Sequence, residues 1–556
     1  MNQLNIYCAN TSQHVTATGG ESLMDIYRRL EPKPHPHPLL ALVNNKSESL
    51  GYSVYRPKHV EYIGIEHPST RRAVIRSLCM VMYKAVNDRY PGKRVCFMHS
   101  VSGGQYCVFK HEDAPITLEV IDRIKSKMEE IIEHDIPFVL HERPTAEVID
   151  MFRRQGLDDK VRLLGTTHSL YTHYYQLGDI IDSFYGPLVP STGCLQAFDL
   201  VPYEDGMLLL GPNWDDPTKP VTPSEQPKMF QAFTEYNQFN DIIGISDVGM
   251  LNQGIKSKYA SLLIGVAEAL HNKKFAEIAA DITRRYHEGG ARVVLIAGPS
   301  SSGKTTSSKR LAVQLITNYI KPVVIALDNY FVNRDQTPRD ETGDYDYESL
   351  YALDLKQFNQ DLTDLLAGKV VQMPTYNFAT GRREYRGDTL HLDENNVLLI
   401  EGIHGLNPEL TRQIPEQQKY RLFVSALTTL RIDDHNWIPT TDNRLLRRIV
   451  RDAKYRGASA RDTIARWPSV RRGEQKWIFP YQENADAMFN SSLLFELSVM
   501  KQYAEPILKQ VPADTPEYAE AWRLLRFLDY FEPLEEKEIP STSLLREFLG
   551  GSSFHY

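Results

Sequence analysis

The sequence predicts an α/β fold in which helices cover a parallel sheet, and two features of its second half carry this prediction. A strand-like apolar run at 293–297 leads directly into a glycine-rich turn and then into a helix-like stretch. Two more apolar runs are each followed by an acidic residue: Asp328 follows the run 322–327, and Glu401 follows the run 397–400. Alternating strands and helices build parallel sheets, which bind ligands at the carboxyl ends of their strands. We therefore expect both carboxylates at one edge of such a sheet.

The turn after the first strand completes the phosphate-binding pattern G-x-x-x-x-G-K-[ST]. Its glycines let backbone N–H groups face phosphate oxygens, and the N-terminus of the following helix adds positive partial charge. Lys304 is expected to bridge the β- and γ-phosphates, while the Thr305 hydroxyl holds Mg²⁺. ATP and Mg²⁺ are therefore the predicted cofactors. The predicted contacts to ATP are Gly298, Ser300, Ser301, Ser302, Gly303, Lys304, Thr305 and Thr306.

Length and composition narrow the class of protein. A chain of 556 residues is too long for one core, so several domains are expected. Hydrophobic residues at 42% and charged residues at 24% are typical of a soluble globular protein, and no apolar run approaches a membrane span. Five scattered cysteines without a C-x-x-C pair favour a reducing cytoplasm. A net charge of −8 argues against a surface built wholly for nucleic acid.

Composition shifts along the chain suggest where the domains divide. The segment 212–227 is rich in Pro, Asp, Thr and Ser and is predicted to be a linker. Two helices are expected after it, at 256–270 and 272–288, the second ending at a Gly-Gly pair. The predicted units are 1–65, a small β-rich domain; 66–220, a mixed α/β domain; 221–285, linker and helices; 286–500, the nucleotide-binding domain; and 501–556, a C-terminal helical tail.

Phosphoryl transfer also needs a base, metal ligands and cations for the developing charge, and the second half supplies candidates for each. Asp328 is placed to take a proton from an acceptor hydroxyl or to order a magnesium water, and Glu401 is the second acid facing the metal. Thr305, Asp328 and Glu401 are therefore the predicted metal ligands. A basic helix is expected at 442–454, and its arginines are predicted to form a phosphate-clamping lid: Arg444, Arg447, Arg448, Arg451 and Arg456.

Residues 290–495 resemble the uridine kinase/phosphoribulokinase family of P-loop kinases. The resemblance rests on the phosphate loop, Asp328-Asn-Tyr-Phe331, Pro374-Thr-Tyr-Asn-Phe378, Ile400-Glu-Gly-Ile403 and the arginine-rich segment that starts at Arg444. It implies a P-loop kinase fold. It also implies that Asp328 is the general base on a 5′-hydroxyl, that Glu401 helps hold magnesium, and that Asp346 binds the ribose hydroxyls. Tyr376 then lies beside the nucleobase, and Lys304, Arg448, Arg451 and Arg456 contact phosphate or substrate.

Three positions depart from the pattern of pyrimidine-specific kinases. Gly381 stands where they carry His, Ala458 where they carry a second lid Arg, and Arg466 where they carry Gln. A site that reads a base by hydrogen bonds loses discrimination when those groups are lost. We expect Gly381 to leave extra room beside the base, so that a purine nucleoside is accepted.

The front half resembles parts of threonyl-tRNA synthetases. Residues 1–65 are similar to their β-grasp module and residues 66–220 to their α+β editing domain, best at Tyr185-Gly-Pro-Leu-Val-Pro-Ser-Thr-Gly193. The family's metal-binding histidines align with Arg76 and Met80, so the metal site is expected to be lost. We therefore expect a binding, regulatory or dimerising module rather than an editing enzyme.

The predicted function is a cytoplasmic ATP-dependent kinase of nucleoside salvage, which phosphorylates the 5′-hydroxyl of a nucleoside. Two alternatives remain open at this point. One is a sugar-phosphate kinase of phosphoribulokinase type, and the other is a tRNA- or RNA-binding regulatory protein that uses nucleotide as a switch. The expected partners are a nucleoside substrate and a second copy of the chain, without a membrane. Every proposed catalytic residue lies within 286–556, so this fragment alone is expected to keep detectable activity.

Overall fold

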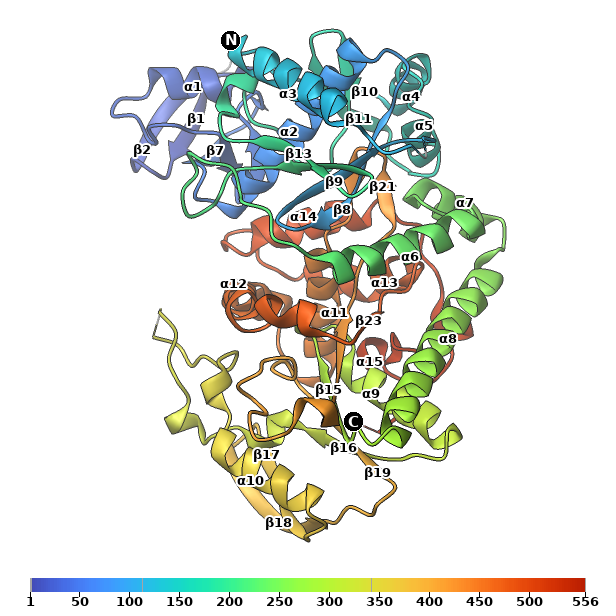
Figure 1. The fold of residues 1–556 in the computed structure, drawn as a ribbon. Helices are drawn as coiled ribbons and strands as arrows, with labels where there is room; N and C mark the ends of the chain where they lie inside the picture. Colours follow the sequence, from blue (N-terminus) through green and yellow to red (C-terminus); the bar gives the residue numbers. More distant parts are fainter. Residues whose placement is uncertain (1–2, 113, 342, 556) are drawn as a thin grey trace.

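The computed structural model of the protein describes residues 3–112, 114–341 and 343–555. The front half, blue to green in Figure 1, packs over one end of the second half, whose strands and hairpin lie at the other end. Of the helices in the described ranges, none combines the length and apolar character that crossing a bilayer requires.

The second half is built on a fully parallel five-stranded sheet, which confirms the predicted α/β architecture. The strand before the phosphate loop, β15, lies in the middle of this sheet, and all of its residues are buried. A fifth strand, β23, was not predicted. The strands, in spatial order, are β16 (Lys321–Ala326), β19 (Asn396–Glu401), β15 (Val293–Ala297), β20 (Lys419–Ser425) and β23 (Ala487–Asn490).

Alternate residues of β15 face two different cores, because successive side chains of a strand point to opposite faces. Val293 and Leu295 pack into the core under α10 (Leu355–Leu366). Val294 and Ile296 pack into the core on the other face, under α8 (Ala260–His287) and α9 (Lys304–Thr317). Helices thus cover both faces of the sheet, as parallel sheets require.

The prediction that two helices divide near residue 271 before the phosphate loop is wrong. The structure has a single helix, α8, across 271 and 272, preceded by the shorter α7 (Val248–Lys256). No glycine or proline stands between 266 and 288 to interrupt it, and His271 at the expected break is buried within the helix. The predicted end is correct: the chain leaves the helix at Gly289, whose φ is +84°.

The described residues of the front half form a mixed sheet, two further sheets and several helices. The mixed sheet has the order β2 (Gln13–Thr18), β1 (Gln3–Cys8), β7 (Lys58–Ile63), β4 (Leu40–Val43), β5 (Lys46–Ser49), with α1 (Leu23–Arg29) and the short pair β3 (Glu21–Ser22) and β6 (Ser53–Val54) beside it. The second sheet has the order β13 (Asp199–Tyr203), β14 (Gly206–Leu210), β9 (Gly104–Phe109), β8 (Val95–Val101). The third sheet has the order β10 (Val139–Pro144), β11 (Tyr171–Leu177), β12 (Ile180–Asp182). The helices are α2 (Pro68–Arg89), α3 (Leu118–Glu133), α4 (Thr145–Arg154) and α5 (Asp158–Leu164).

The remaining elements connect the halves or surround the sheet. A hairpin carries the predicted nucleobase residue Tyr376, and helices from the C-terminal tail pack into the same core as α7 and the start of α8. These elements are α6 (Pro227–Ile243), β17 (Val371–Asn377), β18 (Arg382–Leu390), β21 (Arg431–Asp433), β22 (Asn436–Trp437), α11 (Thr440–Tyr455), α12 (Ala460–Trp477), α13 (Glu496–Leu508), α14 (Tyr518–Leu528) and α15 (Arg546–Leu549).

A buried ionic cluster joins the two halves. Lys160 of α5 is fully buried, and its Nζ lies 2.8 Å from Asp182 and 3.0 Å from Asp433 of the second half. His435 Nδ1 lies 2.7 Å from the other oxygen of Asp182. Removing one partner of such a cluster leaves an uncompensated buried charge. The segment between β20 and α11 is therefore stabilised by side chains of the front half.

Candidate active site

The phosphate loop runs between β15 and α9, and its backbone fits tightly against β20. A Cβ on Gly298 would lie 1.9 Å from the carbonyl oxygen of Val424, so only glycine fits there. Gly303 and Ser301 have φ values of +85° and +60°, which turn the chain sharply into the helix. Within this turn the Ser302 N–H donates to the Pro299 carbonyl at 3.2 Å and the Ser300 N–H donates to Glu474 Oε1 at 3.1 Å, so the loop is held in a compact conformation before the helix begins.

Two of the predicted lid arginines, Arg444 and Arg447, are buried in ion pairs beneath the phosphate loop. Arg444 is paired with the buried Glu474, with Nη2 2.9 Å from Oε2, and donates to the carbonyl of Ser300 at 3.1 Å. Arg447 is paired with Glu496 at 2.6 Å and donates to the next loop carbonyl at 3.4 Å. Both side chains are almost fully buried, so they fix the loop backbone and cannot act as a mobile lid. Helical spacing predicted their face of the helix but not these partners.

The other three arginines gather around one carboxylate, Asp452. The pair distances to this carboxylate are 3.3 Å for Arg448, 2.8 Å for Arg451 and 3.6 Å for Arg456. Arg448 also donates to the Ser300 hydroxyl at 2.7 Å. Asp452 was not predicted to have a role, although it lies within the arginine-rich motif. It holds three guanidinium groups next to the phosphate loop, where they can meet negative charge.

The two predicted carboxylates lie at the same edge of the sheet. β16 and β19 pair so that Ala326 lies opposite Glu401, and Asp328 follows within the short 3₁₀ turn Leu327–Tyr330. The Thr305 hydroxyl donates to Glu401 Oε1 at 3.1 Å. Phosphate loop and carboxylates therefore form one constellation.

The pKa of Glu401 is raised to about 7, mainly by burial; the Lys304 charge opposes this increase, and the nearby Asp328 and Glu547 carboxylates contribute to it. Surrounding protein also raises the pKa of Asp328, although the residue remains exposed to solvent, while Lys304, Arg456 and Arg451 act in the opposite direction. Lys304 donates to the carbonyl of Pro299 at 3.2 Å within the same constellation. Two acids that hinder each other's ionisation are suited to a shared cation.

The oxygen atoms of Asp328, Glu401 and Thr305 suit Mg²⁺, rather than a metal ion that is held by protein ligands alone. Carboxylate and hydroxyl oxygens are the ligand type that Mg²⁺ prefers, and it is usually bound by one or two carboxylates together with substrate phosphates. Asp328, Glu401 and Thr305 supply this set. Across the described ranges, no group of three or more His, Cys, Asp or Glu side chains is arranged to hold a metal ion.

Glu348 is a carboxylate of this region that the sequence interpretation missed. Its Oε2 atom is buried without a hydrogen-bond partner. Its pKa is raised to about 7, mainly by burial; the Glu474 carboxylate contributes to this increase, and Arg448 and Lys304 oppose it. The sequence feature that could have indicated Glu348 is its position two residues after Asp346. Its backbone N–H donates to Asp346 Oδ1 at 3.1 Å, so the two acids are coupled through one turn.

The predicted nucleobase residue belongs to an aromatic cluster near Asp328. Tyr376 packs against Phe331 and Phe378, with ring centroids 5.5 Å and 5.1 Å apart. Its backbone N–H donates to the side chain of Asn329, the neighbour of Asp328, at 3.4 Å. Phe378 remains 61% exposed and offers an open aromatic face. Aromatic faces of this kind stack on planar rings.

The room expected at Gly381 is not present. A Cβ there would lie 2.7 Å from Nε of Arg334, and the Arg334 backbone N–H donates to the Gly381 carbonyl at 2.8 Å. Arg334 also donates to the Phe378 carbonyl at 2.7 Å. The space next to Gly381 is thus filled by the Arg334 guanidinium, which comes from another segment. Ala458 donates its N–H to the Asp452 carbonyl, and Arg466 is exposed.

In the front half, an arginine fills the position where the resemblance placed a metal-binding histidine. Arg76 is buried, donates to the Pro187 carbonyl at 2.9 Å and lies over the Tyr185 ring at 5.6 Å. A Cβ on Gly186 would lie 2.6 Å from its guanidinium. Burial lowers the pKa of Arg76 to about 10, which still leaves a cation at neutral pH.

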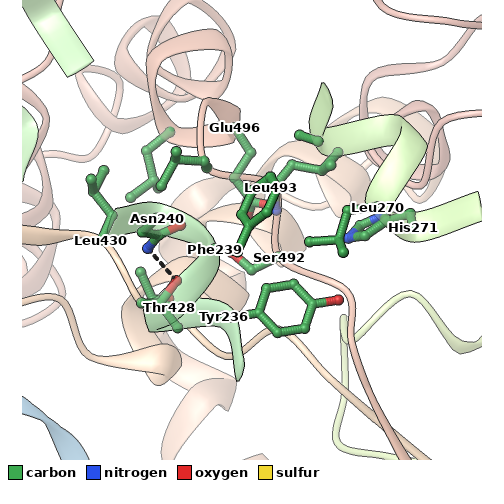
Figure 2. A pocket seen from close by; sticks show the side chains of 14 residues that line it. Tyr236, Phe239, Asn240, Leu270, His271, Thr428, Leu430, Ser492, Leu493 and Glu496 are labelled. Atoms are coloured by element: carbon green, nitrogen blue, oxygen red, sulfur yellow. Dashed lines mark hydrogen bonds between the residues drawn. The ribbon is translucent and has the colours of Figure 1, made fainter. Parts of the chain in front are cut away.

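A small cavity lies beside the loop anchors and apart from the carboxylates (Figure 2). It measures about 20 Å³ and is lined by α6, α8 and the segments after β20 and β23. Asn240 donates to Thr429 at 2.9 Å in its wall. A space of this size accommodates one water molecule, so it is a packing feature rather than a substrate site.

Comparison with known proteins bears on the second half. Residues 293–494 match the model of the Phosphoribulokinase / Uridine kinase family. The chain is 28% identical over 198 residues to uridine kinase of Ureaplasma urealyticum, covering 35% of this chain and 85% of that protein. It is 29% identical over 195 residues to uridine kinase of Staphylococcus aureus, covering 35% and 84%.

Two solved structures are also similar to parts of this chain. A possible uridine kinase from Bacillus stearothermophilus gives a TM-score of 0.24 at 22% identity, covering 36% of this chain and 89% of that one. D-glycerate 3-kinase from Cryptococcus neoformans gives a TM-score of 0.23 at 14% identity, covering 48% and 89%. The family match is confined to residues 293–494, and together with the curated relatives it supports the chain as a phosphotransferase with a hydroxyl acceptor.

Proposed function

We propose that this protein is an ATP-dependent kinase that transfers the γ-phosphate of ATP to the 5′-hydroxyl of a nucleoside. The observation that carries the proposal is the constellation at the carboxyl edge of the sheet. There the Thr305 hydroxyl is bonded to Glu401, and Asp328 lies within electrostatic reach of Lys304. This arrangement supplies every part that phosphoryl transfer requires.

The phosphate loop and its flanking residues hold the donor nucleotide. Loop N–H groups and Lys304 bind the phosphates, and their positions are fixed by the buried Arg444 and Arg447. Thr305, Glu401 and Asp328 would hold Mg²⁺, which neutralises charge between the phosphates when bound. Preorganised donors need no rearrangement during the reaction, and this lowers the barrier.

Asp328 acts as the base. The deprotonated carboxylate accepts the proton of the acceptor hydroxyl as that oxygen attacks the γ-phosphorus. Its raised pKa brings its basicity closer to neutral pH, which strengthens a general base. Arg448, Arg451 and Arg456, held together by Asp452, face the charge that develops on the transferred group.

The acceptor side favours a nucleoside over a sugar phosphate. Phe378 is 61% exposed and packs on the buried rings of Phe331 and Tyr376, so its face is open for a planar base to stack on, and a sugar phosphate makes no use of it. Asp346, whose pKa burial raises, is available to accept bonds from ribose hydroxyls. Arg334 beside this surface is a donor for base carbonyl groups, which uracil, hypoxanthine and guanine all present.

A substrate panel tests the proposal. The full-length protein is supplied with ATP, Mg²⁺ and one of uridine, cytidine, adenosine, guanosine, inosine or ribulose 5-phosphate, and kcat/KM is measured for each. The position of the new phosphate is read by ³¹P NMR. We expect a nucleoside 5′-monophosphate as product, with no strict exclusion of purines. Turnover of ribulose 5-phosphate alone would assign the acceptor to sugar phosphates.

The front half is proposed to support this activity rather than to edit tRNA. Arg76 fills the expected metal position, and Lys160 with Asp182 stabilises the segment that leads into α11. A regulatory or dimerising role on the outer surface is compatible with that support. Titration with tRNA, and sedimentation of the free protein, test the nucleic-acid and oligomer alternatives.

A further inference from the structure

The N-terminus of α9 already has an anionic partner from the far end of the chain. The backbone N–H of Thr306 donates to Glu547 Oε2 at 3.1 Å, and the Thr306 hydroxyl donates to the same oxygen at 2.7 Å. First-turn N–H groups lack partners within their helix and attract anions. Glu547 therefore places a carboxylate where the phosphate loop is built to hold a phosphate.

Apolar anchors bring Glu547 to this position from 241 residues away in the sequence. Its neighbours Leu544, Leu545 and Phe548 are fully buried. Leu544 lies 3.3 Å from the place of a Cβ on Gly303, inside the phosphate loop. Figure 1 shows α15 beside α9, with the C-terminus nearby. We call residues 543–555 the C-terminal strap.

Polar contacts tie the strap to the same two helices that form the nucleotide site. Lys454 of α11 donates to the Leu549 carbonyl, and Lys309 of α9 donates to the His555 carbonyl. The Arg447 guanidinium, which anchors the loop, lies over the Phe548 ring at 5.0 Å. The strap thus contacts the loop, its helix and its anchor, while Glu547 is directed at the loop itself.

We propose that the C-terminal strap is autoinhibitory: Glu547 occupies a phosphate position of the loop, and a nucleotide must displace it to bind. The proposal rests on the proposed function in one respect, that the ligand of the loop is a nucleoside triphosphate. A carboxylate and a phosphate cannot accept the same N–H bond, and they repel each other. Binding of nucleotide and docking of Glu547 therefore oppose each other by the same factor in both directions.

The test compares nucleotide affinity in the full chain with and without this charge. In Glu547→Gln the side chain keeps its size and its place in the fold, but its attraction to the helix N-terminus is weakened. We expect the dissociation constant for ATP, measured by calorimetry without any acceptor, to fall about ten-fold, a common size for such coupling. The control is Glu535→Gln, which makes the same charge change at an exposed residue. The Glu535 Oε2 atom lies 2.9 Å from Nζ of Lys537.

Hydrogen exchange supplies a second reading on the unmodified protein. We expect saturating ATP to increase exchange of the backbone amides at 545–550, because displaced Glu547 loosens α15. Equal ATP affinity in Glu547→Gln and wild type, or weaker binding in the variant, would overturn the proposal, as would greater protection of the strap with ATP. If neither protein binds ATP, the proposed function fails as well, so the two failures are distinguishable.

Discussion

The Thr305 hydroxyl and the Glu401 carboxylate are bonded at 3.1 Å, although 96 residues separate them in the sequence. Thr305 opens the helix after the phosphate loop, and Glu401 ends the strand next to the loop's own strand. Parallel pairing of β15 and β19 brings the two ends together. Under the proposed function, a cation bound to a nucleotide phosphate would lie at this edge of the sheet.

Lys304→Ala is expected to lower kcat by about 10³-fold or more while the fold remains intact, because this charge contacts ligand phosphates rather than core. Steady-state kinetics of the variant measure the loss of kcat, and circular dichroism checks that its fold is intact. Lys369→Ala, at an exposed lysine paired with Asp364, is the matched control. Full activity of Lys304→Ala would remove the loop from the mechanism.

Glu401→Gln is expected to make the melting temperature less dependent on pH. The pKa of Glu401 is raised from 4.5 to about 7 in the folded protein, so ionising it is harder there than in the unfolded chain. Its contribution to stability is fully present below pH 4.5 and is lost as the pH rises toward 7. Between about pH 5 and about pH 8, wild type should therefore lose more stability than the variant.

Melting curves of ligand-free protein across this range measure the difference. Glu341→Gln, which changes an exposed carboxylate, should follow wild type. Parallel curves for wild type and Glu401→Gln would contradict the raised pKa.

The arginines of α11 are expected to separate into structural and functional groups. Arg444→Ala removes one of the two guanidinium groups from the buried Glu474, which keeps Arg471 and the Ser300 N–H, so the free energy of unfolding should fall by about 3 kcal/mol. Arg451→Ala should lose less stability than Arg444→Ala, because Asp452 keeps Arg448 and Arg456 as cationic partners, and should lower kcat instead. Urea denaturation and steady-state kinetics of both variants decide this. Equal stabilities would refute the division.

The fragment 286–556 is now expected to fold poorly, in contrast to what the position of the catalytic residues suggested. Leu163, Val248 and Leu251 of the preceding chain belong to the core that also holds α11 and α13. Without Lys160, Asp433 loses a buried cation. Limited proteolysis of the fragment beside the full chain tests this expectation, and a protease-resistant, active fragment would show that the front half is dispensable.

The sequence predicted those parts of the site that depend on local patterns. An apolar strand, a glycine turn and a helix follow one another within 293–317, so β15, the loop and α9 could be inferred together. Partners distant in the sequence could not. Glu474 lies 30 residues from Arg444 and Glu547 lies 241 from Thr306, and no periodicity links such pairs. The same reason explains why Arg334 beside Gly381 was missed, since the space at a glycine depends on what packs against it.

The measurement that tests the central claim most directly compares Asp328→Asn with wild type, with ATP affinity and nucleoside turnover recorded on the same preparations. Asp335→Asn, at an exposed acid seven residues on, is the control. The amide cannot accept the hydroxyl proton, so kcat should fall by about 10²–10⁴-fold while the dissociation constant for ATP stays within a few-fold. An unchanged kcat in Asp328→Asn would contradict the assignment of Asp328 as the base, and with it the proposed mechanism.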